Sequence, residues 1–196
     1  MPLQQVSVPA TWRYSRFALF FHWILAALIP FQIGFGWYML SIEDTPGSAA
    51  YFALHVSLGL TAALLIALRL MLRLRNRPAP LPATLPAWQV KVASLTHVLL
   101  YVLLVLMPIT GFLGASVSGE PIAFFGISLP VWTSGNNTLK EQFFTAHSII
   151  AWALVALVSL HALGALKHLL IDKNGVFGRM WPWQSLPHRP GKCPYP

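Results

Sequence analysis

The chain is poor in charge and in cysteine, and each deficit excludes a class of protein. Only 9% of its 196 residues are charged, whereas a soluble domain carries about 25%. So little polar surface cannot cover a soluble globule. The single cysteine, Cys193, excludes an intramolecular disulfide and any metal or iron–sulfur site built from several cysteines. Hydrophobic residues make up 56% of the whole sequence, which indicates a protein embedded in a membrane.

Four long apolar runs fill most of the sequence. They cover about residues 17–40, 50–72, 92–115 and 142–171. Each run is long enough to cross a bilayer, which takes roughly 20 helical residues, and a helix satisfies its own backbone hydrogen bonds in lipid. The first run exceeds the apolar core of about 7–15 residues in a signal peptide, so we expect it to be retained. The sequence predicts an all-α, membrane-embedded four-helix bundle, with residues 1–196 as one membrane domain and an irregular tail at 172–196.

The segments between the runs differ in character. Residues 116–141 form the longest connection and are rich in glycine, proline, asparagine and aromatic side chains. We expect this segment to lie on the membrane surface as a partial cap over a site. Pro108, Gly111 and Gly114 predict a kinked or broken end of the third run.

Lysine and arginine are distributed unevenly over the two sides of the predicted bundle. Twelve of the thirteen fall on the side of the two termini, and only Lys140 falls on the other side. The positive-inside rule therefore places both termini in the cytoplasm. We interpret the net charge of +8 as a topology signal, and we expect no nucleic acid partner.

Four of the seven histidines lie at two matched depths. His55 and His147 each lie about five residues from the outer end of their runs, whereas His22 and His161 lie about 27–28 Å from the outer ends of theirs. His147 and His161 are fourteen residues apart, which puts them on one face of one helix about 21 Å apart. Ionisable residues inside membrane helices are costly and usually functional. Two level pairs on different helices predict two metal sites inside the bundle.

Haem iron fits two imidazoles at each level. A zinc site would take about four clustered ligands, often including thiolate or carboxylate, and the apolar runs hold no acid at these depths. A porphyrin supplies four donors itself. We therefore predict that His22, His55, His147 and His161 bind the iron of two haem groups. The alternative is that these histidines only join helices through hydrogen bonds.

Several glycines are predicted to lie against the cofactors. Gly59 follows His55 by four residues and Gly164 follows His161 by three, so each shares the face of its histidine. Gly34 and Gly36 in the first run offer similar access for a flat ring. Close packing of membrane helices is an equally good explanation for all of these glycines.

A second group of residues is predicted to lie near the inner membrane face. Arg16, Arg69 and Arg73 can pair with haem propionates or with a quinone headgroup, and lipid phosphate is the alternative partner. His97 lies at the inner level, so by depth it competes with the predicted inner ligands. It can instead hydrogen-bond a propionate, a quinone or a water. We expect a surface role for His168.

The sequence resembles the bacterial cytochrome b561 family of four-helix, di-haem inner-membrane proteins. The resemblance rests on YSRFALFFHW around His22, YFALHVSLG and LRLMLRL around His55, LTHVLLYVLLVLMPITG around His97, and AHSIIAWALVALVSLHALGALKHLL around the last two ligands. These segments span about residues 14–180. The resemblance implies haem b ligands at His22, His55, His147 and His161, paired 22 with 161 and 55 with 147. It also implies electron exchange with ubiquinone.

Two functions follow from this resemblance. Some family members are similar to superoxide oxidases, so we expect an oxidoreductase that passes electrons from a periplasmic one-electron donor, superoxide being one candidate, to the ubiquinone pool. A superoxide-collecting mouth should be positive, whereas the predicted outer loops carry Glu43 and Asp44. The family is also similar to membrane anchor subunits of hydrogenases and formate dehydrogenases. The alternative is therefore a haem-carrying relay subunit for a soluble periplasmic partner, with no turnover alone, in contact with lipid and quinone.

Overall fold

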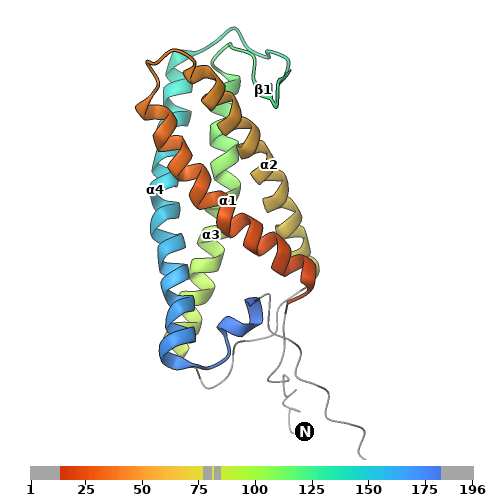
Figure 1. Cartoon of the computed structure of the whole chain (residues 1–196), viewed down its shortest axis with the longest axis vertical. Coiled ribbons are helices and arrows are strands. Elements are labelled where there is room, and N and C mark those ends of the chain that lie inside the picture. Colours follow the sequence, from red (N-terminus) through yellow and green to blue (C-terminus); the bar gives the residue numbers. More distant parts are fainter. Residues whose placement is uncertain (1–13, 77–80, 82–84, 182–196) are drawn as a thin grey trace, which may run out of the picture.

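The structure, a computed structural model, describes residues 14–76, 81 and 85–181. Its four long helices are α1 (Arg16–Ser41), α2 (Ser48–Arg75), α3 (Ala87–Ser116) and α4 (Asn137–Lys167), and they run along the long axis of the molecule (Figure 1). All four are long and apolar enough to cross a membrane. The predicted all-α, membrane-embedded four-helix bundle is confirmed.

Two helices begin well before the apolar runs from which they were predicted, and the other two begin within two residues of theirs. α4 begins five residues earlier because Asn136 caps it, and its side chain accepts the backbone N–H of Leu139 at 3.0 Å. α3 also begins five residues earlier, directly after Pro86. The first turns of both helices include polar and charged side chains, which lower the hydropathy there. α3 continues through Pro108 to its last residue, so the predicted end of this helix is not broken.

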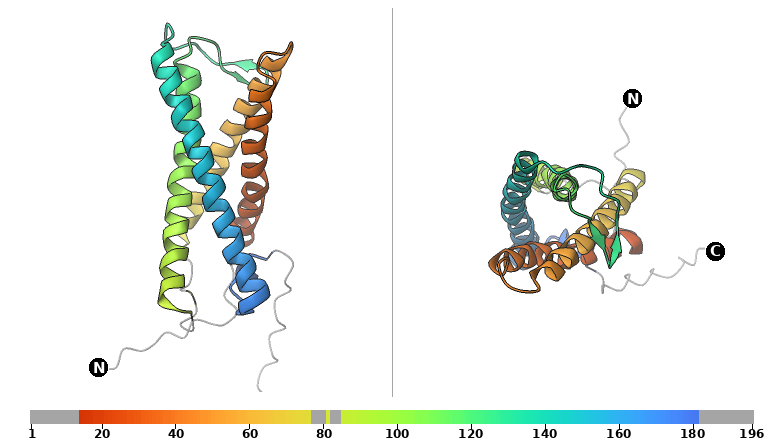
Figure 2. Two further views of the ribbon diagram at one scale, coloured as in Figure 1. Left: turned by 90° about the vertical axis from the view of Figure 1, so that its left-hand side faces the viewer. Right: turned by 90° about the horizontal axis from the view of Figure 1, so that it is seen from above.

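The helices pack in sequence order around the bundle. α1 packs along α2, α2 along α3, and α3 along α4, as the two views of Figure 2 show. Aromatic side chains join α1 to α4, where the rings of Trp37 and Trp152 lie 4.7 Å apart. Ile33, Leu100 and Leu154 form the buried core. Many other large apolar side chains are exposed, as expected for helix faces that meet lipid tails.

The connections at one end of the bundle include a small β-hairpin. Strands β1 (Ala123–Phe124) and β2 (Ile127–Ser128) pair antiparallel within the segment that joins α3 to α4. The turn between α1 and α2 lies at the same end (Figure 1). We call this the hairpin end. The terminal end is the opposite one, where α1 and α3 begin and α2 and α4 finish.

The hairpin is attached to α2 through one buried serine. Ser57 is 1% exposed, and its hydroxyl accepts the N–H of Phe125 at 2.9 Å and donates to the carbonyl of Ala53 at 2.7 Å. The carbonyl of Ala123 lies a further 3.3 Å from the same hydroxyl. The connection therefore lies against α2 two residues beyond His55.

Beyond Lys167 the chain stays helical at the terminal end. It continues as a π-helix (His168–Asp172) and later forms a 3₁₀ turn (Phe177–Met180). Asp172 accepts hydrogen bonds from Lys167, and its carboxylate lies 2.9 Å from Nδ1 of His168. His168 is therefore held at the end of α4. The start of the predicted irregular tail thus contains a helical turn, whereas residues 182–196, including Cys193, lie outside the described residues.

Candidate functional site

Near the hairpin end, His55 of α2 and His147 of α4 face each other. Their ring centroids are 6.3 Å apart and their planes are inclined by 78°. With metal–nitrogen bonds of about 2 Å and about 1 Å from each nitrogen to its ring centre, two imidazoles on opposite sides of one metal have centroids about 6 Å apart. The pair therefore has the spacing of two ligands that share one metal ion.

A second pair with the same spacing lies toward the terminal end. The rings of His22 on α1 and His161 on α4 are 6.2 Å apart and inclined by 83°. His97 of α3 lies closer to His161, at 5.1 Å, with its ring edge-on. That distance is too short for two imidazoles on opposite sides of one metal. The geometry therefore favours His22 over His97 as the partner of His161, a choice that depth alone left open.

A metal ion at either pair needs further donors. Within the described ranges, no three His, Cys, Asp or Glu side chains gather closely enough to hold a metal ion. A porphyrin has four nitrogen donors and leaves two axial positions, which is the number of imidazoles in each pair.

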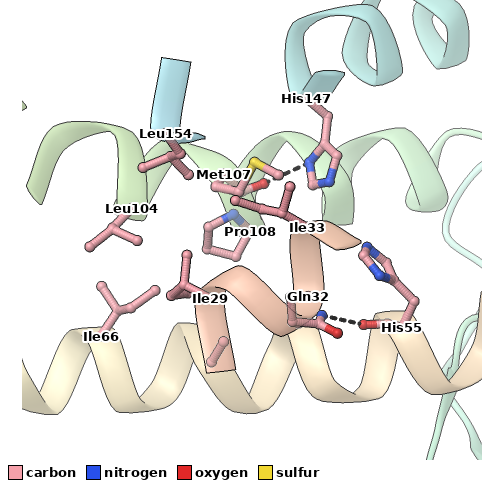
Figure 3. Close-up of a pocket in the computed structure, with 12 residues that line it drawn as sticks. Ile29, Gln32, Ile33, His55, Ile66, Leu104, Met107, Pro108, His147 and Leu154 are labelled. Atoms are coloured by element: carbon pink, nitrogen blue, oxygen red, sulfur yellow. Dashed lines mark hydrogen bonds between the residues drawn. The ribbon is translucent and has the colours of Figure 1, made fainter. Parts of the chain in front are cut away.

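A cavity of about 450 Å³, counting its open mouth, adjoins the hairpin-end pair. Figure 3 shows His55 and His147 projecting into it from different helices, with Gln32 beside His55. Its other walls are mainly apolar and include Ile29, Ile66 and others from α1 to α4. Apolar cavities with a few placed polar groups are typical of cofactor sites.

Two glycines make room for the imidazoles of this pair. A Cβ atom on Gly111 of α3 would lie 2.8 Å from Cε1 of His147. A Cβ atom on Gly36 of α1 would lie 3.2 Å from Cε1 of His55. Gly36 therefore accommodates a histidine ring. Sequence analysis missed this role of Gly111, because the contact crosses from one helix to another and leaves no signal in spacing.

The other predicted glycines differ in their surroundings. Gly59 lines the cavity, and a Cβ atom there would lie 3.5 Å from Nε2 of Gln32. A Cβ atom on Gly164 or Gly34 would meet no atom within 4 Å. These two glycines have no close protein neighbour to accommodate.

The protein orients His147 through hydrogen bonds to α3. Its Nδ1 lies 3.0 Å from the carbonyl of Met107 and 3.3 Å from the hydroxyl of Thr110. Because a carbonyl only accepts, Nδ1 carries the proton, and Nε2 is left with its lone pair free for a metal. Hydrogen bonds of this kind are the usual partners of metal-binding histidines.

At the terminal end, a second cavity of about 680 Å³, counting its open mouth, is lined by two of the predicted basic residues. Arg69 and Arg73 line it together with His97. Arg69 donates to the carbonyl of Ala18 at 3.2 Å and Arg73 to the hydroxyl of Tyr14 at 3.0 Å. In the part of the chain that the structure describes, neither guanidinium is paired with a carboxylate. The cavity is thus positively charged and suits an anionic group.

Arg16 is the predicted basic residue that does not join this cavity. It is exposed at the first residue of α1. Its place at the membrane edge agrees equally with a lipid phosphate as its partner.

Comparison with known proteins decides the family. The family model for prokaryotic cytochrome b561 matches residues 13–183. This chain belongs to the prokaryotic cytochrome b561 family. It is 27% identical over 179 residues to cytochrome b561 homolog 1 of Escherichia coli (strain K12), covering 87% of this chain and 97% of that protein. It is 29% identical over 170 residues to cytochrome b561 homolog 2 of the same strain, covering 86% and 90%.

A third relative is named for an activity. The chain is 29% identical over 93 residues to the probable superoxide oxidase CybB of Yersinia pestis, covering 47% of this chain and 53% of that protein. Family membership and the four spanning helices make this chain a multi-pass, haem-binding electron-transport protein of the bacterial inner membrane.

The residues at the hairpin-end pair fit the haem b that the family implies. The cavity is apolar, two imidazoles reach it, and glycine gives each ring clearance. Nδ1 of His147 already has the kind of partners that a haem-binding histidine would require. Haem bound there would supply one-electron redox chemistry, while the protein would supply its ligands, burial and hydrogen bonds.

Proposed function

We propose that this cytochrome b561 holds two haem b groups and passes electrons between them across the membrane. One haem would be bound by His55 and His147, the other by His22 and His161. The observation that supports this is the equal spacing of the two pairs, 6.3 and 6.2 Å. Since α4 contributes one histidine to each pair, its helical rise sets the two sites about 21 Å apart.

The orientation follows from charge. The terminal end carries most of the basic residues, among them Arg69, Arg73 and Lys167, so it would face the cytoplasm. The hairpin end would face the periplasm. Electrons from a periplasmic donor would then enter at the hairpin-end haem and leave at the terminal-end haem.

The terminal-end cavity would hold the acidic groups of the inner site. Arg69 and Arg73 can bind haem propionates or a quinone headgroup, because guanidinium groups bind carboxylates through two parallel hydrogen bonds. His97 lines the same cavity and can hydrogen-bond a propionate, a quinone or a water. Arg16 would assist from the membrane edge. Gly59 and Gly164 would lie beside the two macrocycles.

The electron acceptor would be the ubiquinone pool, and the donor a periplasmic one-electron reductant. Superoxide is the first candidate because one relative is named as a probable superoxide oxidase. A purified sample should show low-spin b-type bands in a reduced-minus-oxidised spectrum and two haems per chain. Adding ubiquinone should then accelerate the loss of superoxide. One haem per chain would contradict the di-haem proposal, and no acceleration by quinone would remove superoxide as the donor.

One observation favours an alternative donor. The hairpin end exposes Glu43, Asp44, Glu120 and Glu141. This negative surface would repel superoxide and attract a basic soluble protein. In that case the chain would be a relay subunit without turnover of its own. Reduction by a basic soluble cytochrome that slows sharply as salt rises would support this alternative, whereas salt-independent reduction would contradict it.

A further inference from the structure

The two histidines of the hairpin-end pair differ in their hydrogen bonding. Nδ1 of His147 has a carbonyl and a hydroxyl as partners. Nδ1 of His55 is buried and has no partner within the described residues. A histidine that binds a metal through one ring nitrogen almost always donates the N–H of the other. His55 therefore lacks an acceptor that its counterpart has.

A matching acceptor lies next to His55. Gln32 on α1 is only 8% exposed, and its amide nitrogen donates to the backbone carbonyl of His55 at 3.0 Å. The oxygen of the same amide, Oε1, is buried without a donor. Both residues line the hairpin-end cavity (Figure 3). The structure thus leaves one donor and one acceptor unpaired in the same apolar cavity.

Leaving either atom without a hydrogen-bond partner would cost free energy. The cavity walls are mainly apolar, and a polar group buried without a hydrogen bond is strongly unfavourable in lipid or in a protein core. Among the residues that the structure describes, the other buried side-chain oxygens without donors belong to Gln89 and Ser116, and neither residue lines this cavity. A single water can bridge two polar groups in such a cavity.

We propose that Gln32 is a positioning residue of the hairpin-end haem site. Its Oε1 accepts the Nδ1–H of His55, directly or through one buried water, while its NH₂ group holds the backbone of α2 at His55. This proposal rests on the proposed function, since it requires haem iron on Nε2 of His55. The acceptor fixes the ring orientation and makes the imidazole more basic. More electron density on the iron stabilises the oxidised haem and lowers its reduction potential.

The test compares three variants of the purified di-haem protein. Gln32→Leu removes both polar groups of the side chain at similar size. Gln32→Glu keeps an acceptor oxygen in either protonation state. Gln89→Leu is the matched control, because Gln89 also has a buried unpaired oxygen but lies at the start of α3, at the other end of the bundle. The readouts are the midpoint potentials of both haems and the electron paramagnetic resonance spectrum of the oxidised protein.

In Gln32→Leu, the potential of the hairpin-end haem should rise and its resonance signal should shift, while the terminal-end haem stays unchanged. This variant should also lose the hairpin-end haem to an acceptor protein about tenfold faster, in line with the usual cost of removing such a partner. Gln32→Glu should keep the potential at or below that of the unaltered protein. Gln89→Leu should change none of these values.

The outcomes that would contradict the proposal can be distinguished from one another. If Gln32→Leu shifts the midpoint potential and the resonance signal of the hairpin-end haem no more than Gln89→Leu does, Gln32 is not the acceptor. If Gln32→Glu raises the potential of the hairpin-end haem as much as Gln32→Leu does, only the hydrogen bond from the NH₂ group to the backbone of His55 matters. Gln32 is then not the acceptor for His55. If the unaltered protein carries no haem at the hairpin-end pair, the proposed function itself fails before Gln32 is tested.

Discussion

Gly111 of α3 touches the ring of His147 so closely that no side chain fits between them. A methyl group at residue 111 would lie 2.8 Å from Cε1 and 3.0 Å from Nδ1 of the imidazole. The first contact is shorter than Cβ atoms adopt, and the second is tighter than an ordinary van der Waals contact. The imidazole is further fixed by the carbonyl of Met107, one turn earlier on α3. One turn of α3 thus provides both the hydrogen-bond acceptor and the space that this ring needs.

Gly111→Ala should displace His147 and impair the hairpin-end haem. The expected result is loss of about half of the bound haem, with the terminal-end haem retained, measured by haem quantification and by optical redox titration. Gly34→Ala is the matched control, because a Cβ atom at residue 34 of α1 meets nothing within 4 Å. Helix propensity alone favours alanine at both positions. Full haem content in Gly111→Ala would show that the ring can shift without losing its ligand.

Replacing single histidines should remove one haem at a time. His147→Leu should leave only the terminal-end haem, and His161→Leu only the hairpin-end haem, because each variant takes one imidazole from one pair. His97→Leu should keep both haems, since His97 lies too close to His161 for the two rings to bind one iron from opposite sides. The spectrum and the haem content per chain measure the result. A His97→Leu protein with one haem would make His97 a ligand in place of His22.

Ser57→Ala should detach the hairpin from α2. The buried hydroxyl accepts the N–H of Phe125 at 2.9 Å, and leaving that N–H without its partner costs about 1–3 kcal/mol. Hydrogen–deuterium exchange at Phe125 should accelerate, while exchange in the middle of α2 stays slow. Ser128→Ala is the control on the same hairpin, at an exposed side chain. Equal exchange in the two variants would mean that the hairpin is held by other contacts.

Thr110→Val should have a smaller effect on the hairpin-end haem than Gln32→Leu. It removes one of two partners of His147, and the carbonyl of Met107 remains at 3.0 Å. The potential of this haem should therefore rise only slightly. Thr61→Val serves as the control, because the hydroxyl of Thr61 donates to the carbonyl of Ser57 within its own helix at 2.9 Å. If the potential of this haem shifted more in Thr110→Val than in Gln32→Leu, the hydroxyl of Thr110 would be the dominant hydrogen-bond partner at this site.

The depth of each histidine could be predicted from the sequence because helical rise is fixed. Fourteen residues between His147 and His161 define both separation and face, whatever the neighbouring helices do. The sequence also predicted that Arg69, Arg73 and His97 gather near the terminal end, and they line one cavity there.

Contacts between helices could not be predicted in this way. They depend on how each helix is rotated against its neighbours, so the clearance at Gly111 and the contact of Gln32 with His55 left no sequence pattern. Depth alone could not choose between His22 and His97, and only the family resemblance favoured His22. The hairpin was also missed, because strands of two residues are too short to show alternation.

Because α4 is the last of the four long helices and contributes to both histidine pairs, biosynthesis imposes an order on assembly. After α1, α2 and α3 have entered the bilayer, His22 and His55 still have no partners across the bundle. Neither pair exists until α4 has been inserted beside them. A nascent chain that ends before α4 should therefore bind no haem and stay colourless. Haem should be bound only at the final stage of biogenesis.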